Sequence, residues 1–222
     1  MEQLLYLAHS LDKFVVGMEG NVSCKNDDGL SFLIKASGTE LKSLSYSELI
    51  KCDIDGKKLH DNRNPSIEVS FHALIYKLNP DIRFIAHTHP TNTVSILCSD
   101  YMDHFANARL FPDQVVFNGS KSCVIPYTMP GIKLCAQIGY SLNNFINMYK
   151  VFPKLILLEN HGIICAGQSI AECLIATEIC EKSAEIFLKS KTLGKLNTLR
   201  ISDINEIEND QNEKYRKSLL NK

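Results

Sequence analysis

The segment FIAHTHPTNT, residues 84–93, constrains the fold more than any other part of the sequence, because it sets two histidines one residue apart at the end of an apolar run. In a β-strand, alternate side chains project from the same face, so His87 and His89 should point the same way while Thr88 points away. Two imidazoles on one face of a strand have a chelating geometry. The segment therefore predicts a strand that ends at a candidate metal site.

A third histidine stands in LILLENHGIICAG, residues 155–167, where an apolar strand leads to His161 in a turn marked by Gly162. Three imidazoles with one vacant coordination position are typical of a catalytic zinc site, because a substrate can occupy the vacant position. The competing interpretation is that each histidine is a hydrogen-bonded core residue, as single strand histidines usually are. The pairing of His87 with His89 favours the metal site.

Glu68 lies in NPSIEVSFH, residues 64–72, directly after a Pro-Ser pair that predicts the start of a helix. The exposed amides and the dipole of a helix favour an acidic side chain in its first turn, which is one explanation for this residue. The other is that a carboxylate beside a metal ion transfers a proton to or from a bound substrate. His72, one helical turn later, could orient Glu68, although packing is the commoner role for such a residue.

Three short stretches of small residues could build an anion pocket, because small residues expose backbone amides that bind phosphate oxygens. They contain Gly20 with Asn21, Ser37 with Gly38, and Ser66. Glycine, serine and asparagine are also common in ordinary turns, which is the alternative explanation for each stretch. Lys35, two residues before Ser37, could add a positive charge to the pocket or could be a solvated strand lysine.

Apolar spacing and turn residues predict an alternation of helices and strands. Helices are expected over residues 3–16, 45–50, 66–79, 92–98, 133–149 and 169–193. Strands are expected at residues 21–25, 30–38, 81–89, 114–117, 123–127, 154–160 and 163–167, with a hairpin over residues 51–59. No repeat or low-complexity linker divides residues 1–201, which should form one α/β domain. Residues 202–222 are polar and should form a tail that is mobile or is ordered at an interface.

The charge balance argues against a nucleic-acid or membrane-surface partner, since 24 basic and 25 acidic side chains leave a formal net charge of -1. A small-molecule substrate is the better expectation. The eight cysteines are scattered without a CxxC pair, and no basic stretch precedes the first apolar residues. No apolar run approaches the roughly 20 residues that cross a bilayer. We therefore expect a cytoplasmic protein with reduced cysteines.

The motifs GNVS, ASGT, PSIE, HTHP and ENHG occur in this order between residues 20 and 162, and together they resemble the class II aldolase/adducin family. That family includes zinc-dependent fuculose-phosphate and rhamnulose-phosphate aldolases, ribulose-phosphate 4-epimerases, methylthioribulose-phosphate dehydratases and the non-enzymatic adducin head domains. The resemblance covers roughly residues 3–190. It implies a three-layer α/β/α sandwich around a mixed, largely antiparallel sheet, assembled as a homotetramer with sites near subunit interfaces.

The resemblance also implies roles for single residues. His87, His89 and His161 would hold one Zn²⁺ per chain, and Glu68 would be the catalytic acid. Asn21, with Gly20 before it, and Ser37, Gly38 and Ser66 would bind the phosphate of a sugar phosphate. The implied function in carbohydrate metabolism is a lyase that cleaves a phosphorylated ketose, by a reversible retro-aldol reaction, to dihydroxyacetone phosphate and an aldehyde.

Other functions fit the same motifs. An epimerase, dehydratase or decarboxylase could use the same zinc site, although the epimerases resemble one another in having aspartate where this chain has Glu68. A non-catalytic adducin-like protein typically lacks the full metal set. The chain departs from fuculose-phosphate aldolases at Ile67, where they have a second serine, and at Met18. Tyr127 and Tyr215 are candidates for an aromatic proton donor that acts across a subunit boundary.

Overall fold

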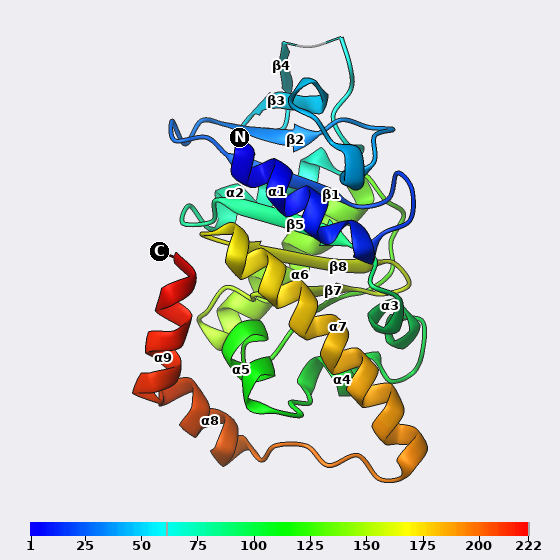
Figure 1. The fold of residues 1–222 in the computed structure, drawn as a ribbon, viewed down its shortest axis with the longest axis vertical. Coiled ribbons are helices and arrows are strands. Elements are labelled where there is room, and N and C mark those ends of the chain that lie inside the picture. Colours follow the sequence, from blue (N-terminus) through cyan, green and yellow to red (C-terminus); the bar gives the residue numbers. More distant parts are fainter. Residues whose placement is uncertain (61, 222) are drawn as a thin grey trace.

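The computed structural model describes residues 1–60 and 62–221 of the chain, and a mixed eight-stranded sheet forms its centre (Figure 1). The strand order is β4-β3-β2-β1-β5-β8-β7-β6, and all neighbours are antiparallel except β6 and β7. The strands are β1 (Asn21–Lys25), β2 (Ser31–Lys35), β3 (Leu49–Asp53), β4 (Lys58–His60), β5 (Phe84–Thr88), β6 (Cys123–Ile125), β7 (Leu155–Leu158) and β8 (Gly162–Gly167). The expected largely antiparallel α/β architecture is confirmed.

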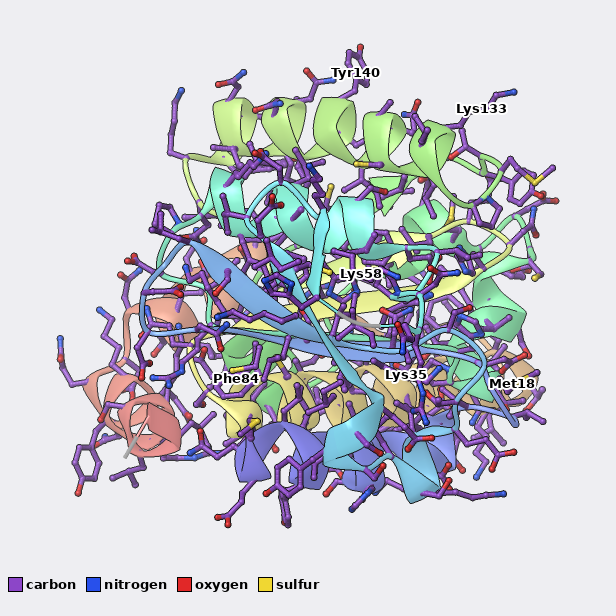
Figure 2. The ribbon with its side chains drawn as sticks, turned by 90° about the horizontal axis from the view of Figure 1, so that it is seen from above. Met18, Lys35, Lys58, Phe84, Lys133 and Tyr140 are labelled. Carbon is purple, nitrogen blue, oxygen red and sulfur yellow. The ribbon has the colours of Figure 1, made fainter. Side chains whose placement is uncertain are left out.

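Helices cover both faces of the sheet and make the three layers (Figures 1 and 2). One face carries α2 (Val69–Leu78) and α6 (Ile132–Tyr149), and the other carries α1 (Glu2–Leu11) and α7 (Ile170–Leu193). The remaining helices are α3 (Thr91–Leu97), α4 (Met102–Asn107), α5 (Pro112–Asn118), α8 (Ile201–Asn209) and α9 (Gln211–Ser218). Short 3-10 turns are η1 (Asp12–Phe14), η2 (Leu41–Ser43), η3 (Tyr46–Glu48) and η4 (Leu219–Asn221).

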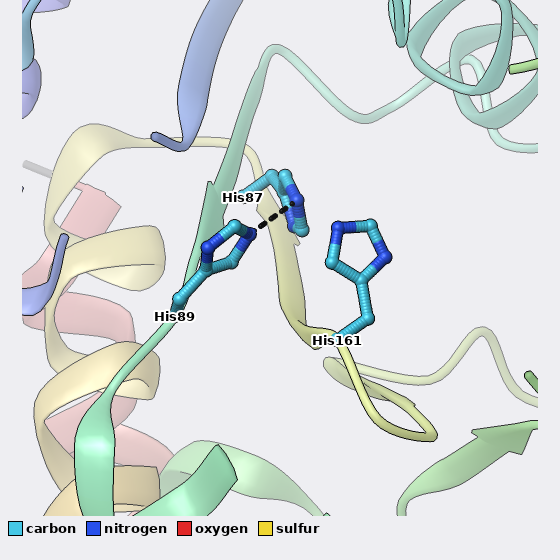
Figure 3. A group of neighbouring side chains, drawn as sticks. All are labelled: His87, His89 and His161. Atoms are coloured by element: carbon cyan, nitrogen blue, oxygen red, sulfur yellow. Dashed lines mark hydrogen bonds between the residues drawn. The ribbon is translucent and has the colours of Figure 1, made fainter. Parts of the chain in front are cut away.

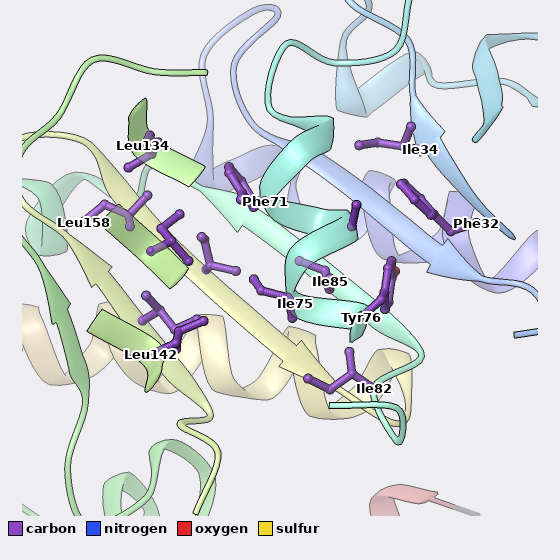
Figure 4. Close-up of a cluster of buried hydrophobic side chains, with 14 of the residues drawn as sticks. Phe32, Ile34, Phe71, Ile75, Tyr76, Ile82, Ile85, Leu134, Leu142 and Leu158 are labelled. Carbon is purple, nitrogen blue, oxygen red and sulfur yellow. The ribbon is translucent and has the colours of Figure 1, made fainter. Parts of the chain in front are cut away.

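Each face of the sheet has its own apolar core. On the α2–α6 face, Phe32 and Ile85 of the sheet pack with Phe71 and Ile75 of α2 and with residues of α6 (Figure 4). The opposite face packs against α1 and α7 in two further clusters, one of them built around Phe187. Complete burial of such a side chain is worth about 1.5–3 kcal/mol. These cores hold the central strands of the sheet in place, and those strands carry the candidate site residues.

The central strand β5 places His87 in this interior and ends just before His89. All five of its residues are buried, because helices cover the sheet on both sides. In the register of the sheet, His87 lies opposite Asn21 of β1 and opposite Ile164 of β8. Ile85 packs in the core beneath α2, so His87, two residues later in the strand, faces the same helix.

The expected strand at residues 114–117 is wrong, because this segment is part of helix α5. Its paired valines favour a strand on propensity, but Pro112 occupies the first helical turn and Gly119, at φ 81°, ends the helix. Helix α4 was also not expected. The helix expected over residues 45–50 is only the turn η3, followed directly by β3, and the helix expected from residue 66 begins at Val69.

The polar C-terminal segment forms α8 and α9, which lie beside α5 (Figure 1). Ile204 is buried, and Arg216 forms an ion pair with Asp113 of α5 at 2.9 Å. The mobility or interface role expected of residues 202–222 stays a prediction. None of the helices described is both long and apolar enough to span a membrane.

Candidate metal centre

The three histidines singled out in the sequence meet at one end of the sheet (Figure 3). His87 lies in β5 one residue before its end, His89 follows that strand, and His161 lies in the turn between β7 and β8. One ring nitrogen from each lies within 4.8 Å of the others. The expected convergence of His87 and His89 with His161 is therefore confirmed.

Two residues of the β7–β8 turn let it approach His89 this closely. A Cβ atom at Gly162 would lie 2.5 Å from the Thr88 carbonyl oxygen and 2.5 Å from His89 Cδ2, so only glycine fits without a shift of the backbone. Asn160 adopts a left-handed conformation at φ 51°, which asparagine tolerates better than most residues. Its backbone N–H donates to the carbonyl of Leu97, which ties the turn to α3.

The hydrogen bonds of His87 assign its tautomer. His87 Nδ1 lies 2.9 Å from the carbonyl oxygen of Ile163, which can only accept, so Nδ1 carries the proton. The lone pair of Nε2 then faces the other imidazoles, with His89 Nε2 at 3.0 Å. A metal ligand oriented by a carbonyl in this way is common in proteins.

The imidazoles are held neutral, as metal ligands must be. Burial, assisted by the neighbouring His161, lowers the pKa of His87 to about 3. Burial and the neighbouring His87 lower the pKa of His89 to about 4, and burial also lowers the pKa of His161. At neutral pH the cluster therefore offers unprotonated nitrogens to a cation.

Glu68, the residue directly before α2, lies beside the three histidines. Its side chain is buried, and its Oε2 accepts a hydrogen bond from Asn21 Nδ2 at 2.9 Å and lies 3.2 Å from His87 Nε2. Oε1 lies 3.6 Å from His161 Nε2 and has no hydrogen-bond partner among the residues described. A buried carboxylate oxygen without a partner beside three neutral imidazoles fits a divalent cation in this position. The three histidines thus form a metal-binding site.

Asn21 is held by a buried row of side chains that was not predicted from the sequence. Asn21 Oδ1 contacts His72 Nε2, His72 Nδ1 lies 2.7 Å from Ser23 Oγ, and Ser23 Oγ lies 2.7 Å from Tyr76 Oη. Two spacings in the sequence point to this row. Residues 68, 72 and 76 share one face of a helix, and residues 21 and 23 share one face of a strand.

The structure brings together the serines and glycine expected to bind phosphate. Ala36 and Pro65 form an isolated bridge, and the Ser37 N–H donates to the carbonyl of Asn64. Ser37 and Gly38 are consequently exposed beside Ser66. Gly20 is packed differently, since a Cβ atom there would lie 2.7 Å from the carbonyl oxygen of His87.

Lys35 is buried at the end of β2, contrary to the solvated alternative (Figure 2). Its ammonium donates to the carbonyl of Met18 at 3.0 Å, and no carboxylate in the described ranges lies within 4 Å of it. Burial lowers the pKa of Lys35, whereas the negative charge of Glu68 raises it. The buried ammonium of Lys35 thus places a positive charge near Glu68, and a positive charge can attract an anion.

The two candidate tyrosines lie in different places. Tyr127 follows β6, and its N–H donates to Glu159, two residues before His161. Tyr215 lies in α9, on the opposite side of the molecule from the junction of β5 and α3 (Figure 1). A cavity of about 500 Å³ between α5, α6 and the C-terminal helices shares none of its described lining residues with the metal site.

Comparison with known proteins agrees with this geometry. The family model described as Class II Aldolase and Adducin N-terminal domain matches residues 3–188. A 3-oxo-tetronate 4-phosphate decarboxylase from Haemophilus influenzae is 31% identical over 196 residues, 88% of this chain and 89% of the relative. An L-fuculose phosphate aldolase from Methanocaldococcus jannaschii is 28% identical over 183 residues, 82% of this chain and 91% of the relative. A putative aldolase/epimerase/decarboxylase from Escherichia coli superposes with a TM-score of 0.78 at 25% identity, over 93% and 96% of the two chains.

Proposed function

The chain belongs to the class II aldolase/adducin family, and from that premise we propose that it is a lyase that breaks a carbon–carbon bond next to the ketone of a phosphorylated substrate. The observation that carries this proposal is the buried Glu68 carboxylate, with one oxygen unpartnered, beside three neutral histidines. Such a pair of functions, a Lewis acid and a proton carrier, is what cleavage next to a carbonyl needs.

His87, His89 and His161 would hold the metal, and we propose zinc, one ion per chain. Three imidazole ligands with a position left for substrate are typical of catalytic zinc. When bound, the ion supplies Lewis-acid polarisation of the substrate carbonyl.

Decarboxylation of a 3-oxo sugar acid phosphate is the reaction we favour. In such a substrate the bond between C1 and C2 breaks, carbon dioxide leaves, and the bonding pair remains on C2, where the adjacent ketone delocalises it. Glu68 Oε1 takes a proton from water and delivers it to C2, and the hydroxide that remains combines with carbon dioxide to give hydrogencarbonate. The Haemophilus relative supports this choice, and so does the buried ammonium of Lys35, because this substrate has a carboxylate as well as a phosphate.

Retro-aldol cleavage of a ketose phosphate is the second candidate, supported by the methanogen aldolase. It uses Glu68 in the same way, but an aldehyde leaves instead of carbon dioxide. A base must therefore also remove the proton of the hydroxyl group on the departing carbon, and Tyr127 or Tyr215 of a neighbouring subunit would be the candidates. Both reactions can give dihydroxyacetone phosphate, so the leaving fragment is what distinguishes them.

For the phosphate we propose the hydroxyl groups of Ser37 and Ser66 and the backbone amide of Gly38, which lie together. The backbone amides of Ser37 and Ser66 already donate to the carbonyls of Asn64 and Lys35. Gly20 and Asn21 would border the pocket on the metal side. The Asn21 side chain has one amide proton committed to Glu68, which leaves the other for substrate.

Zinc-loaded protein should be incubated with 3-oxo-tetronate 4-phosphate and, separately, with ketose 1-phosphates. Dihydroxyacetone phosphate is measured by a coupled reduction, carbon dioxide by its release and the aldehyde by trapping. Equimolar carbon dioxide and dihydroxyacetone phosphate from the first substrate would support the decarboxylase. An aldehyde from a ketose phosphate at higher kcat/KM would establish the aldolase instead, and turnover of neither would contradict both.

A further inference from the structure

A row of buried side chains links the interior of the protein to Glu68. It runs from Tyr76 through Ser23, His72 and Asn21 to Glu68, and every member is buried. The contacts are Tyr76 Oη to Ser23 Oγ at 2.7 Å, Ser23 Oγ to His72 Nδ1 at 2.7 Å, His72 Nε2 to Asn21 Oδ1 at 2.5 Å, and Asn21 Nδ2 to Glu68 Oε2 at 2.9 Å.

The donors and acceptors of this row can be assigned from chemistry alone. A carboxylate only accepts, so Asn21 must turn its amide nitrogen towards Glu68 and its oxygen towards His72. The oxygen also only accepts, which places the proton of His72 on Nε2. Burial lowers the pKa of His72 well below its usual value, so the ring is neutral and its Nδ1 accepts from the Ser23 hydroxyl.

The last contact follows in the same way. Because Ser23 uses its only proton towards His72, Tyr76 must donate to Ser23 Oγ. The carbonyl of Arg83, at 3.4 Å from Tyr76 Oη, is the weaker alternative acceptor. All four bonds therefore point in one direction, towards Glu68, and bonds aligned in this way polarise one another.

This direction has a consequence for the two oxygens of Glu68. Donation from His72 prevents the Asn21 amide from rotating, since a flipped amide would set its oxygen against the carboxylate. Oε2 is then permanently occupied by Asn21, whereas Oε1 has no partner in the described structure and faces His161. Only one oxygen is left for exchange with a substrate.

We propose that His72 and Ser23 are positioning residues that fix Glu68 through Asn21 and reserve Oε1 for proton transfer. The inference rests on the proposed lyase function of the same site. Both side chains are fully buried, so a substrate cannot contact them and their effect should reach the reaction only through the carboxylate.

The competing explanation is that these groups merely satisfy one another inside the core, as buried polar groups do. Substitutions would then lower stability without a selective effect on kcat. His72→Leu removes both ring contacts, His72→Gln keeps a donor and an acceptor, and Ser23→Ala removes one link. Ser183→Ala is the matched control, because Ser183 is equally buried but donates to the carbonyl of Ile179 in α7.

For His72→Leu we expect about one zinc per chain, a KM close to wild type and a kcat lowered by about 10- to 100-fold, the usual effect of losing an outer-shell partner. Ser23→Ala should show part of this loss, His72→Gln should recover part of the activity, and Ser183→Ala should keep kcat. Equal kcat in all four variants, or loss of zinc from His72→Leu with no effect on kcat once zinc is restored, would overturn the proposal.

A second measurement does not depend on turnover. Long-range ¹H–¹⁵N spectra of zinc-loaded, histidine-labelled protein should show His72 protonated on Nε2, whereas His87 should be protonated on Nδ1. His72 protonated on Nδ1 would reverse the row and overturn the inference even in an active enzyme. If wild-type protein turned over none of the substrates, the lyase function and the catalytic role of the row would both fail, and the His72 tautomer would still show whether the direction of its bonds was right.

Discussion

The sequence allows two roles for Glu68, helix capping and proton transfer, and the positions of its two carboxylate oxygens decide between them. As the residue before α2 it resembles a helix-capping acid, yet its carboxylate makes no capping bond to that helix. Instead Oε2 is bonded to Asn21 and Oε1 faces His161. The carboxylate is directed at the metal site, which is the arrangement expected of a proton carrier.

Glu68→Gln should retain metal and lose most turnover. The amide has nearly the same shape but cannot exchange a proton, so kcat should fall by about 100- to 10,000-fold. Metal content and kcat are measured on the same preparations, with Glu40→Gln at an exposed ion pair as the control. If Glu68→Gln kept wild-type kcat, the proton carrier would be another group.

Buried histidines should make the stability of the metal-free protein depend on pH. Burial lowers the pKa of His72 well below 6.5, of His87 to about 3 and of His89 to about 4. The unfolded chain therefore binds protons first as pH falls below about 6.5, and each such histidine lowers the free energy of unfolding by up to about 1.4 kcal/mol per pH unit.

Urea denaturation at pH 7.5 and 5.5 measures this dependence. We expect lower stability at pH 5.5, and a smaller difference between the two pH values in His72→Gln than in wild type. His60→Gln, at an exposed position on β4, should leave the difference unchanged. Equal stability at both pH values would show that the interior accommodates charged imidazoles.

The metal ligands could be predicted from the sequence because strand alternation alone places His87 and His89 together. The row from Tyr76 to Asn21 could not, although its spacings are visible. It depends on the pairing of β1 with β5 and on α2 lying over that face, both of which join residues far apart in the chain. The burial of Lys35 depends likewise on the loop at Met18, which no local pattern reveals.

At the scale of elements, the site depends on how α3 is held after the HTHP motif. The first residues of this helix have no side-chain cap of their own. Glu181 of α7 supplies it, since its carboxylate accepts from the backbone N–H groups of Asn92 and Thr93 and from both of their side chains. A negative group at a helix start is also favoured by the helix dipole.

Glu181→Gln should therefore destabilise the protein and weaken metal binding. The amide replaces one acceptor by a donor that faces backbone N–H groups, and leaving such donors unpaired costs about 1–3 kcal/mol. The matched control is Glu185→Gln, one turn later in α7, where the side chain pairs with Lys189 on the surface. Urea denaturation and zinc affinity are compared, and equal values for the two variants would deny Glu181 this role.

Helices and strands with a clear period were predicted well, whereas the segment between β5 and β6 was not. There the paired valines of α5 suggest a strand, and burial of Val115 beside α7 is satisfied equally by a helix. Pro112 and Gly119 were the better guide, because their backbone preferences do not depend on tertiary contacts.

At the scale of the whole molecule, the sheet gathers residues between positions 20 and 162 at one end of its central strands. The exposed serine turn and the buried lysine lie at the end of β2, and the histidines lie on β5 and at the ends of β5 and β8. In the sheet β5 is next to β8, and β1 separates β5 from β2. This grouping could be predicted from the sequence only because the order of the motifs resembles that of a known family. Periodicity predicts which segments are strands, but not which strands pair.

The last prediction concerns assembly and the C-terminal helices. We expect a closed homotetramer with each metal site near a subunit boundary, as the family resemblance implies. Tyr215 belongs to α9, which lies on the opposite side of the molecule from α3, the helix that follows the HTHP motif (Figure 1), so any catalytic role for it requires a neighbouring subunit. Deletion of residues 203–222 should then lower kcat while zinc content persists, although loss of the buried Ile204 will also reduce stability.

Tyr215→Phe separates these two effects, because it removes the hydroxyl and leaves the packing of Ile204 intact. A lower kcat in both variants would support a catalytic arm. A lower stability in the deletion with wild-type kcat in Tyr215→Phe would assign the segment to packing against α5, in line with the ion pair between Arg216 and Asp113. Light scattering on active protein decides the assembly itself, since a fully active monomer would rule out both the tetramer and any residue acting across its boundary.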